Sequence, residues 1–434
     1  MTRLPTFPRW FIVLLTLVLC ASFSFGAPSK RSKHVPSRSA NKKVVAKKKS
    51  SASVVKKVKS TAGAKSSKAR VSKAKTTSTQ RHARTRRTSR SKVKRGRVVS
   101  AKATGFVAGG PWLEPTFADS TAGDIVDGED LVVRRAAVAA LGPLNGTVVV
   151  TDPQTGRILT IVNQQLAFKS GFQPCSTIKI VAALAGLTEG VIDRETSVRL
   201  YGRTRMNLTD ALAKSNNPYF ANVGVKLGYD KVAYYAKMYG LGEKAGLDIE
   251  EEQLGTIPDG PPKNGGMGMM TSFGEGIKLT PLQLSALLSA IANGGTLYYL
   301  QYPHSQEEIA HFVPRVKRHL PIEELIPDVT PGMHGATEYG TARRAAYEAE
   351  NPIYGKTGTC TDRATPTHLG WFGSYNEVAG RKLSVVVLLT GGRPVSGPVA
   401  SGVAGQIYRT LEEQHFFSTP HTISPVALVS GSSW

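Results

Sequence analysis

The sequence lacks acidic residues over a long stretch near its beginning. Residues 28–104 contain 27 lysines and arginines, no aspartate or glutamate, and no phenylalanine, tryptophan or tyrosine. A segment of this composition cannot bury enough apolar surface to offset the entropy of ordering it. We therefore expect 28–104 to be a disordered polybasic tail. Two roles remain open for it: a solvated spacer, or a cationic contact with anionic wall polymer or a membrane surface.

The excess of positive charge belongs to that tail and not to the rest of the chain. The 434 residues carry a formal net charge of +25. Residues 105–434, in contrast, hold 27 basic and 31 acidic side chains. A mildly acidic body does not fit a nucleic-acid-binding fold, so no nucleic-acid partner is expected.

Cysteine is scarce, with three residues in the whole chain: Cys20, Cys175 and Cys360. This number excludes a scaffold held together by disulfides. The two cysteines beyond the tail can form one bridge or remain free thiols. The nine histidines form no His-Glu-x-x-His pair and no cluster with cysteine, so no metal site is expected.

The apolar run at the N-terminus is short. It extends from Trp10 to Leu19, follows Arg3 and Arg9, and precedes small residues that end at Ala27. A membrane-spanning helix needs about 20 apolar residues, whereas a signal peptide needs fewer. The pattern predicts an export signal over 1–27, with a retained membrane anchor as the alternative.

Hydrophobic patterning beyond the tail predicts one mixed α/β domain at 144–418. Strands are expected near both ends of this segment and helices between them, so one sheet should contain strands from both ends. A connector is expected at 105–143 and a C-terminal tail at 419–434. The expected strands are 147–152, 157–162, 354–359, 369–375 and 383–390, and the expected helices are 176–189, 282–292 and 399–413.

A serine and a lysine lie three positions apart at the expected start of a helix, in Ser176-Thr177-Ile178-Lys179. This spacing puts both side chains on one face of the helix. The free N–H groups at a helix start can stabilise an oxyanion, and the helix dipole lowers the pKa of a lysine there. Such a lysine can take the proton of the serine, so Ser176 is a candidate nucleophile and Lys179 its base.

A hydroxyl and an amide lie two positions apart in Ser215-Asn216-Asn217. Both side chains can point into one cleft from a loop between helices. Taken alone, the pattern is typical of a helix stop.

The third motif is Lys356-Thr357-Gly358-Thr359. On a strand, Lys356 and Gly358 share one side, and Thr357 and Thr359 share the other. Gly358 would let a substrate backbone lie close to the strand. Lys356 or the two hydroxyls can bind a carboxylate.

In this order, the three motifs resemble the motif set of penicillin-binding proteins and serine β-lactamases. The surrounding stretches 239–246, 274–295, 340–342 and 370–375 narrow the resemblance to the transpeptidase domain of penicillin-binding proteins, over roughly 145–415. The resemblance implies an α/β fold of the penicillin-binding/β-lactamase type. In that fold an antiparallel sheet is flanked by helices and accompanied by an all-helical subdomain.

The resemblance also implies roles for the first two motifs. Ser176 would attack the D-Ala-D-Ala end of a peptidoglycan stem peptide, or a β-lactam antibiotic, and form an acyl-enzyme. Lys179 would be the general base in acylation. Ser215 would relay the proton to the leaving group, and Asn217 would bind the substrate amide and Lys179.

For the third motif, Lys356 would raise the local positive potential, and Thr357 and Thr359 would hold the substrate carboxylate. The backbone N–H groups of Ser176 and Thr359 would form the oxyanion hole. No metal or organic cofactor is implied.

The resemblance further implies a disulfide between Cys175 and Cys360. In the family's fold the nucleophile helix and the Lys-Thr-Gly strand run side by side, and class A carbapenemases carry a bridged cysteine pair near the active site. Two buried free thiols are the alternative. The gap of 39 positions between Ser176 and Ser215 is shorter than usual in the family's transpeptidases, which would open the acceptor side of the cleft.

The function expected first is an extracytoplasmic, periplasmic peptidoglycan DD-transpeptidase, or a DD-carboxypeptidase if water is the acceptor. A serine β-lactamase is the second candidate, because the run 172–180 resembles class D enzymes. Against it, Asn217 lies where class D enzymes carry a hydrophobic residue. A β-lactam sensor or acyl trap without turnover is the third.

Overall fold

The structure is a computed structural model, and it describes residues 112–345, 350–362 and 365–418. The expected segments 1–27, 28–104 and 419–434 lie outside these residues. Among the helices of the described ranges, none has both the length and the apolar character needed to cross a membrane.

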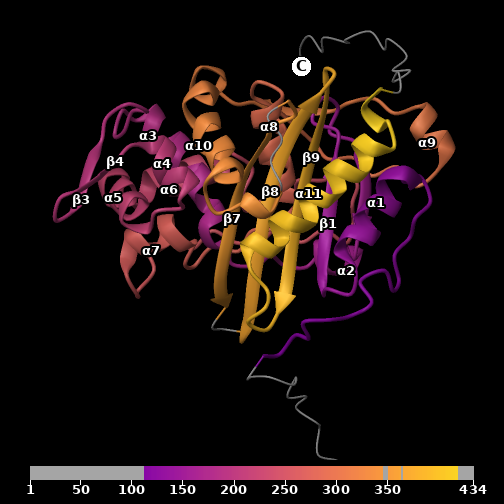
Figure 1. Cartoon of the computed structure of the whole chain (residues 1–434), viewed down its shortest axis with the longest axis horizontal. Coiled ribbons are helices and arrows are strands. Elements are labelled where there is room, and N and C mark those ends of the chain that lie inside the picture. The colour runs from indigo at the N-terminus through magenta and orange to yellow at the C-terminus, as the bar shows by residue number, and fades with distance from the viewer. Residues whose placement is uncertain (1–111, 346–349, 363–364, 419–434) are drawn as a thin grey trace, which may run out of the picture. The chain divides into compact units, whose positions relative to one another are not determined.

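A five-stranded antiparallel sheet of order β2-β1-β9-β8-β7 forms the centre of the body (Figure 1). The pairing of β1 with β9 joins the two ends of the domain, as the sequence predicts. The late strands are longer than predicted because the pairing of β8 with β9 continues beyond the apolar runs 369–375 and 383–390. The strands are β1 (Gly146–Thr151), β2 (Ile158–Val162), β7 (Ile353–Asp362), β8 (Thr367–Val378) and β9 (Arg381–Gly391).

The two faces of the sheet bury alternate residues in two separate cores. Val385 and Val387 of β9 belong to one core, which also holds residues of α1 (Leu131–Leu141) and α11 (Gly397–Glu413). Val386 and Leu388 belong to the other core, together with α8 (Pro281–Ala292). In Figure 1, α1 and α11 lie in front of the sheet and α8 lies behind it. The alternation follows from the two-residue period of a strand.

Helix α8 shows why the predicted helices formed where they did. Pro281 occupies its first turn, and Thr280 and Gln283 form a capping box that satisfies backbone donors at the start. All twelve of its residues are buried. Its start and end agree with the sequence-based prediction to within one residue.

Helix α1 corrects the expectation that residues 105–143 are a connector outside the domain. Val133 and Leu141 are buried in the core that α1 and α11 share with one face of the sheet. Arg134 points inward and pairs with Asp124 at 2.7 Å and with Glu129 at 3.0 Å. The sequence did not predict this helix, because it carries a buried, paired arginine on its inner side.

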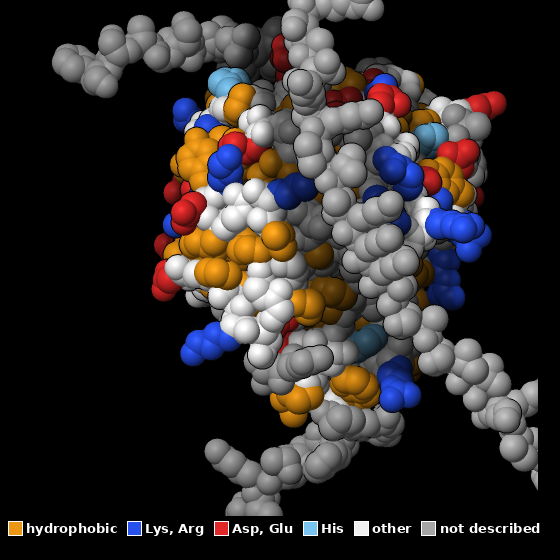
Figure 2. Space-filling view, turned by 90° about the vertical axis from the view of Figure 1, so that its left-hand side faces the viewer, with side chains coloured by type: hydrophobic (Ala, Val, Ile, Leu, Met, Phe, Trp, Pro, Cys, Tyr) orange, Lys and Arg blue, Asp and Glu red, His pale blue; other side chains and the backbone are white. Residues whose placement is uncertain are grey.

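A mainly helical region lies beside the β7 edge of the sheet and contributes the other half of the site (Figure 1). We expected it to be all-helical, but it includes the hairpin of β3 and β4, and the alternating burial of β3 fits a strand. Figure 2 views this side of the body, where hydrophobic patches alternate with single charged side chains. The elements of the region are η1 (Cys175–Ile178), α3 (Lys179–Thr188), β3 (Val198–Tyr201), β4 (Thr204–Met206), α4 (Leu208–Ala213), α5 (Asn217–Leu227), α6 (Tyr229–Met238), α7 (Gly266–Phe273) and α10 (Ile326–Glu338).

Short elements complete the described chain. They are α2 (Gln164–Ala167), β5 (Thr296–Tyr298), α9 (Gln306–Ala310), β6 (Val316–His319), η2 (Glu323–Leu325), η3 (Arg343–Ala345) and η4 (Phe416–Ser418).

Candidate active site

Ser176 lies on a single 3-10 turn, η1, that leads into α3. The sequence predicted one continuous helix over 176–189. The turn is tighter because Thr177 bonds back to the carbonyl of Pro174 through both its N–H, at 3.1 Å, and its hydroxyl, at 2.7 Å. Cys175 before the serine has a φ of 51°, in the left-handed region that non-glycine residues rarely adopt. Ser176 is 8% exposed at this turn.

A disulfide between Cys175 and Cys360 joins this turn to β7, with Cα atoms 5.5 Å apart. It confirms the expected pairing. Gly358 adds a second close approach between the same elements, since a Cβ there would lie 2.9 Å from the carbonyl oxygen of Pro174. The glycine therefore admits the nucleophile turn. That it also lets a substrate backbone lie close to the strand stays a prediction.

The side-chain amine of Lys179 is the centre of a hydrogen-bond cluster. It lies 2.7 Å from Ser176 Oγ, 3.2 Å from Ser215 Oγ, 3.1 Å from the Ser215 carbonyl oxygen and 2.6 Å from Asn217 Oδ1. Lys179 is fully buried. Burial and, to a smaller extent, the charge of Lys356 lower the pKa of Lys179 to about 6.

A neutral Lys179 amine has two N–H donors and one lone pair. The Ser215 carbonyl and Asn217 Oδ1 can only accept hydrogen bonds, so they use both donors. The lone pair is then left for a hydroxyl, and Ser176 Oγ is the nearer of the two that contact the amine. This arrangement lets Lys179 take the proton of Ser176.

The loop between α4 and α5 delivers the second motif to the same place. Asn216 caps α5 by accepting a hydrogen bond from the N–H of Tyr219 at 2.8 Å, so the motif is also the helix boundary that its composition indicates. Ser215 has a φ of 54°, an uncommon backbone conformation outside glycine that turns the chain sharply before α5. Ser215 and Asn217 both contact Lys179.

Lys356 brings a second amine to the Ser215 hydroxyl. Its Nζ donates to Ser215 Oγ at 2.8 Å and to the carbonyl of Thr357 at 3.0 Å. The side chain is fully buried, and this burial lowers the pKa of Lys356 to about 7. One hydroxyl therefore lies between two lysines, which gives a short path for a proton.

The threonines of β7 face the start of α11, on the side of the strand opposite to Gly358. Thr359 Oγ1 accepts a hydrogen bond from the N–H of Gly397 at 2.7 Å. Because that bond uses a lone pair, the Thr359 hydrogen stays free to be donated to an anion. The N-terminus of the 17-residue helix α11 adds positive potential at this point.

The model of the penicillin-binding protein transpeptidase domain matches residues 146–411. This chain belongs to that family. Stage V sporulation protein D of Bacillus subtilis (strain 168) is 29% identical over 227 residues, which are 46% of this chain and 34% of that protein. The peptidoglycan D,D-transpeptidase MrdA of Escherichia coli (strain K12) is 25% identical over 296 residues, 53% of this chain and 46% of that protein. The chain thus spans less than half of the length of these two relatives.

Two further comparisons agree with this family of transpeptidase domains. The peptidoglycan D,D-transpeptidase PbpA of Mycobacterium tuberculosis (strain ATCC 25618 / H37Rv) is 25% identical over 336 residues, 63% of this chain and 67% of that protein. The D,D-transpeptidase domain of a peptidoglycan glycosyltransferase from Eggerthella lenta has a TM-score of 0.55 at 20% identity, covering 66% of this chain and 82% of that chain. The shared fold confirms the expected architecture of an antiparallel sheet flanked by helices.

Several residues around the transpeptidase motifs were given no role from the sequence. The rings of Phe220 and Phe273 lie 5.9 and 5.8 Å from the Lys179 amine and help to exclude water from it. The Thr341 hydroxyl contacts the Thr357 hydroxyl at 2.5 Å. Thr341 belongs to a stretch that matches the family, but a threonine before a strand carries no chemical signal of its own.

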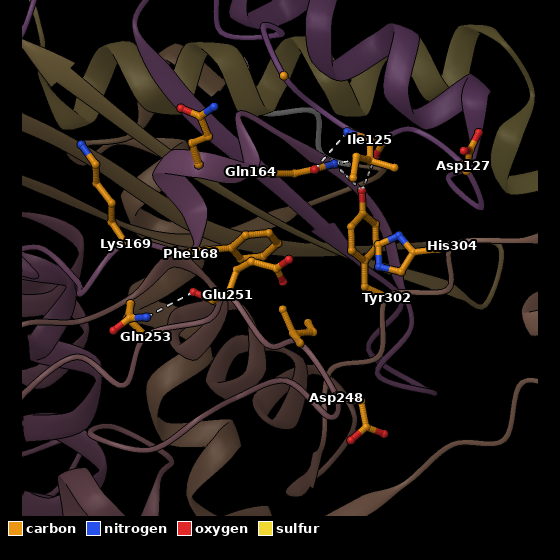
Figure 3. Close-up of a pocket in the computed structure, with 13 residues that line it drawn as sticks. Ile125, Asp127, Gln164, Phe168, Lys169, Asp248, Glu251, Gln253, Tyr302 and His304 are labelled. Atoms are coloured by element: carbon orange, nitrogen blue, oxygen red, sulfur yellow. Dashed lines mark hydrogen bonds between the residues drawn. The ribbon is translucent and has the colours of Figure 1, made fainter.

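A cavity of about 680 Å³ elsewhere in the body is separate from this site. Figure 3 shows Phe168 and Tyr302 reaching into it, with Asp248 and Lys169 on its rim. Among the described residues, those that line it include no member of the three motifs. In the described ranges, likewise, no three histidine, cysteine or acidic side chains gather as metal ligands would.

Proposed function

We propose that the chain is a peptidoglycan DD-transpeptidase that acts outside the cytoplasm and forms an acyl-enzyme on Ser176. The observation that carries the proposal is the contact of Ser176 Oγ with Lys179 Nζ at 2.7 Å, in a cluster that continues through Ser215 to Lys356. The names of the relatives from Escherichia coli and Mycobacterium tuberculosis support it.

Acylation begins with proton transfer. Neutral Lys179 takes the proton of Ser176 as its Oγ attacks the carbonyl of the penultimate D-Ala in a stem peptide. The backbone N–H groups of Ser176 and Thr359 hold the resulting oxyanion. When the tetrahedral intermediate collapses, the peptide bond breaks, and Lys179 returns its proton through Ser215 to the amine of the departing D-Ala.

Deacylation uses the same groups in reverse. An amine from a second stem peptide attacks the ester carbonyl and loses a proton to Lys179 through Ser215. The ester bond breaks, and Ser176 Oγ takes that proton back. The products are a cross-linked peptide and the regenerated serine.

Substrate binding rests on the third motif. The hydroxyls of Thr357 and Thr359 hold the terminal carboxylate, and the positive potential of Lys356 and of the α11 N-terminus favours the anion. Asn217 binds the substrate amide while it fixes Lys179.

A stem pentapeptide ending in D-Ala-D-Ala, offered with an amine acceptor, tests the proposal. The full chain should release D-Ala and form the cross-linked product, and Ser176→Ala should do neither. Ser289→Ala is a matched control because this buried serine lies on α8 and its hydroxyl has no hydrogen-bond partner among the described residues. That variant should keep both activities.

The other outcomes of this assay separate the remaining candidates. Release of D-Ala without cross-linking would make the chain a DD-carboxypeptidase. Continuous hydrolysis of a penicillin would make it a β-lactamase. A penicillin adduct without any peptide turnover would make it a sensor or acyl trap, and each of these results would overturn the proposal.

The proposed location and anchoring depend on the segments outside the described residues. The export signal at 1–27 would take the body to the periplasm, where peptidoglycan lies. The basic segment 28–104 would contact anionic wall polymer or membrane surface. Binding of the full chain to anionic but not zwitterionic vesicles, weakening as salt rises, is the expected result.

A further inference from the structure

Thr341 belongs to a turn that is fixed from two sides. Gly340 and Ala342 close the end of α10 by donating to the carbonyls of Gly335, at 2.8 Å, and Ala336, at 2.7 Å. The Thr341 N–H donates to the carbonyl of Ala213 at 3.1 Å.

This turn packs tightly against the end of α4, next to the loop that carries Ser215 and Asn217. A Cβ on Gly340 would lie 2.2 Å from the Ala213 oxygen. Ala213 ends α4, two residues before Ser215. The position of Thr341 is therefore set by the same helix that delivers Ser215 to the two lysines.

The hydroxyl of Thr341 points from this fixed turn to β7. Thr341 Oγ1 and Thr357 Oγ1 are 2.5 Å apart, and among the described residues neither hydroxyl has another hydrogen-bond partner. Thr357 is only 4% exposed, so water does not compete freely for its hydroxyl. In such a pair, one hydroxyl donates its hydrogen and the other accepts it.

The direction of that hydrogen bond decides what Thr357 can offer to a substrate. If Thr341 donates, the Thr357 hydrogen remains free for an anion, and the bond it then forms is strengthened by the polarisation of the pair. If Thr357 donates to Thr341, it presents only lone pairs to a carboxylate and repels it. A bound carboxylate selects the first arrangement, in which the Thr341 hydroxyl is the donor that holds the Thr357 oxygen in place and leaves its hydrogen directed at the carboxylate.

We propose that Thr341 is a positioning residue that orients the Thr357 hydroxyl toward the substrate carboxylate and so sets the preference for substrates that carry one. The inference rests on the proposed function. Thr341 itself touches neither the reacting carbonyl nor the nucleophile.

The test compares a penicillin with its methyl ester, which has the same reactive ring but no carboxylate. Acylation of the full chain by benzylpenicillin and by benzylpenicillin methyl ester is measured for wild type, Thr341→Val and Thr341→Ser. With Thr341→Val, the acid should react about tenfold more slowly at low concentration, because the Thr357 hydroxyl loses the hydrogen bond that orients it toward the carboxylate. The ester should change by less than about twofold, since there is no carboxylate to orient.

Two further readouts separate positioning from a structural role. The loss with the acid should appear as a higher half-saturating concentration, with the maximal acylation rate unchanged. Thr341→Ser, which restores a hydroxyl, should recover the acid-to-ester ratio. Thr337→Val is the matched control, because Thr337 on α10 donates to the carbonyl of Ile353 on β7 at 2.7 Å and does not contact Thr357. It should lower the melting temperature and leave the ratio unchanged.

Different results of this experiment would contradict the proposed function and the role of Thr341. If wild type reacts with neither compound, the proposed function fails. If wild type reacts and Thr341→Val slows acid and ester equally, or if Thr341→Ser does not recover the ratio, Thr341 is structural and the inference is wrong.

Discussion

Two buried lysines share one hydroxyl, and this arrangement sets the protonation state of the site. Lys179 and Lys356 both contact Ser215 Oγ, at 3.2 and 2.8 Å. Their burial penalises the charged form of each, because the body offers them hydroxyls and carbonyls and no carboxylate among their hydrogen-bond partners in the described ranges. Lys179 is therefore available as a base near neutral pH.

The pH dependence of acylation follows from these two lysines. The rate constant for acylation by a penicillin should rise as pH passes about 6, since Lys179 then loses its proton, and should fall above about 7 as Lys356 loses its charge. Stopped-flow measurement with a fluorescent penicillin from pH 5 to about 10 records this profile.

Lys356→Met provides the control for that profile. The falling limb should disappear, and the rising limb should move to higher pH because the charge of Lys356 no longer lowers the pKa of Lys179. A wild-type rate that climbs steadily toward the pKa of an ordinary lysine would contradict the account.

For single residues, the positions of the three motifs could be predicted from the sequence. The spacing of their serine, lysine and asparagine side chains indicates which of them can act together chemically. Ser176, Lys179, Ser215, Asn217 and Lys356 meet in one cluster. Phe220 and Thr341 were missed, since their role depends on tertiary contacts that leave no local pattern. The close approach of Gly358 to Pro174 was also missed, because the neighbour of its missing Cβ lies far away in the sequence.

At the scale of elements, the site depends on how closely η1 lies against β7. The disulfide between Cys175 and Cys360 joins these elements covalently. The absence of a Cβ at Gly358 lets them approach closely. The two backbone N–H groups assigned to the oxyanion hole belong to the residues next to the two cysteines. The disulfide therefore fixes the distance between those donors.

Removing the disulfide should weaken both the fold and the chemistry. The bridge closes a loop of 185 positions, so Cys175→Ala/Cys360→Ala should lower the free energy of unfolding by about 2–5 kcal/mol. Acylation by penicillin should also slow, because Ser176 is less firmly placed. Chemical denaturation and acylation kinetics measure the two effects.

Reduction of the wild type provides the control for the cysteine variant. A reductant should reproduce the loss in the wild type and have no effect on the double variant. Equal stability of both proteins with and without reductant would show that the bridge contributes nothing.

The predicted and observed elements differ where long-range contacts take over from local pattern. The strands 369–375 and 383–390 were found from their apolar runs, but β8 and β9 extend further through pairing at their ends. The start of the helix at 176 became η1 because Thr177 bonds to Pro174 next to a bridged cysteine. Neither effect has a periodic signal in the sequence.

At the scale of the whole molecule, the domain begins earlier than its family motifs. The sheet joins the two ends of the domain as its hydrophobic patterning predicts. Helix α1 completes the core on one face, however, and the buried pairs of Arg134 with Asp124 and Glu129 fasten the preceding segment to it. A charged residue facing a core contradicts the usual helix pattern, so the sequence alone could not reveal this layer.

Truncation tests the position of this boundary. A chain of 112–434 should unfold cooperatively and react with penicillin. A chain of 144–434 should do neither, because it exposes the apolar face that Val133 and Leu141 cover. Circular dichroism melting and penicillin labelling of the two chains give the answer, and equal behaviour would restore the boundary expected from the sequence.

In the proposed reaction, the Ser176 hydroxyl is the group that becomes acylated. Mass spectrometry of the full chain after reaction with benzylpenicillin tests it most directly, with the adduct mapped by proteolysis. We expect one penicilloyl group per chain, on the peptide that contains Ser176, and none after Lys179→Ala at neutral pH. An adduct on another residue, or a Lys179→Ala variant that reacts as fast as wild type, would contradict it.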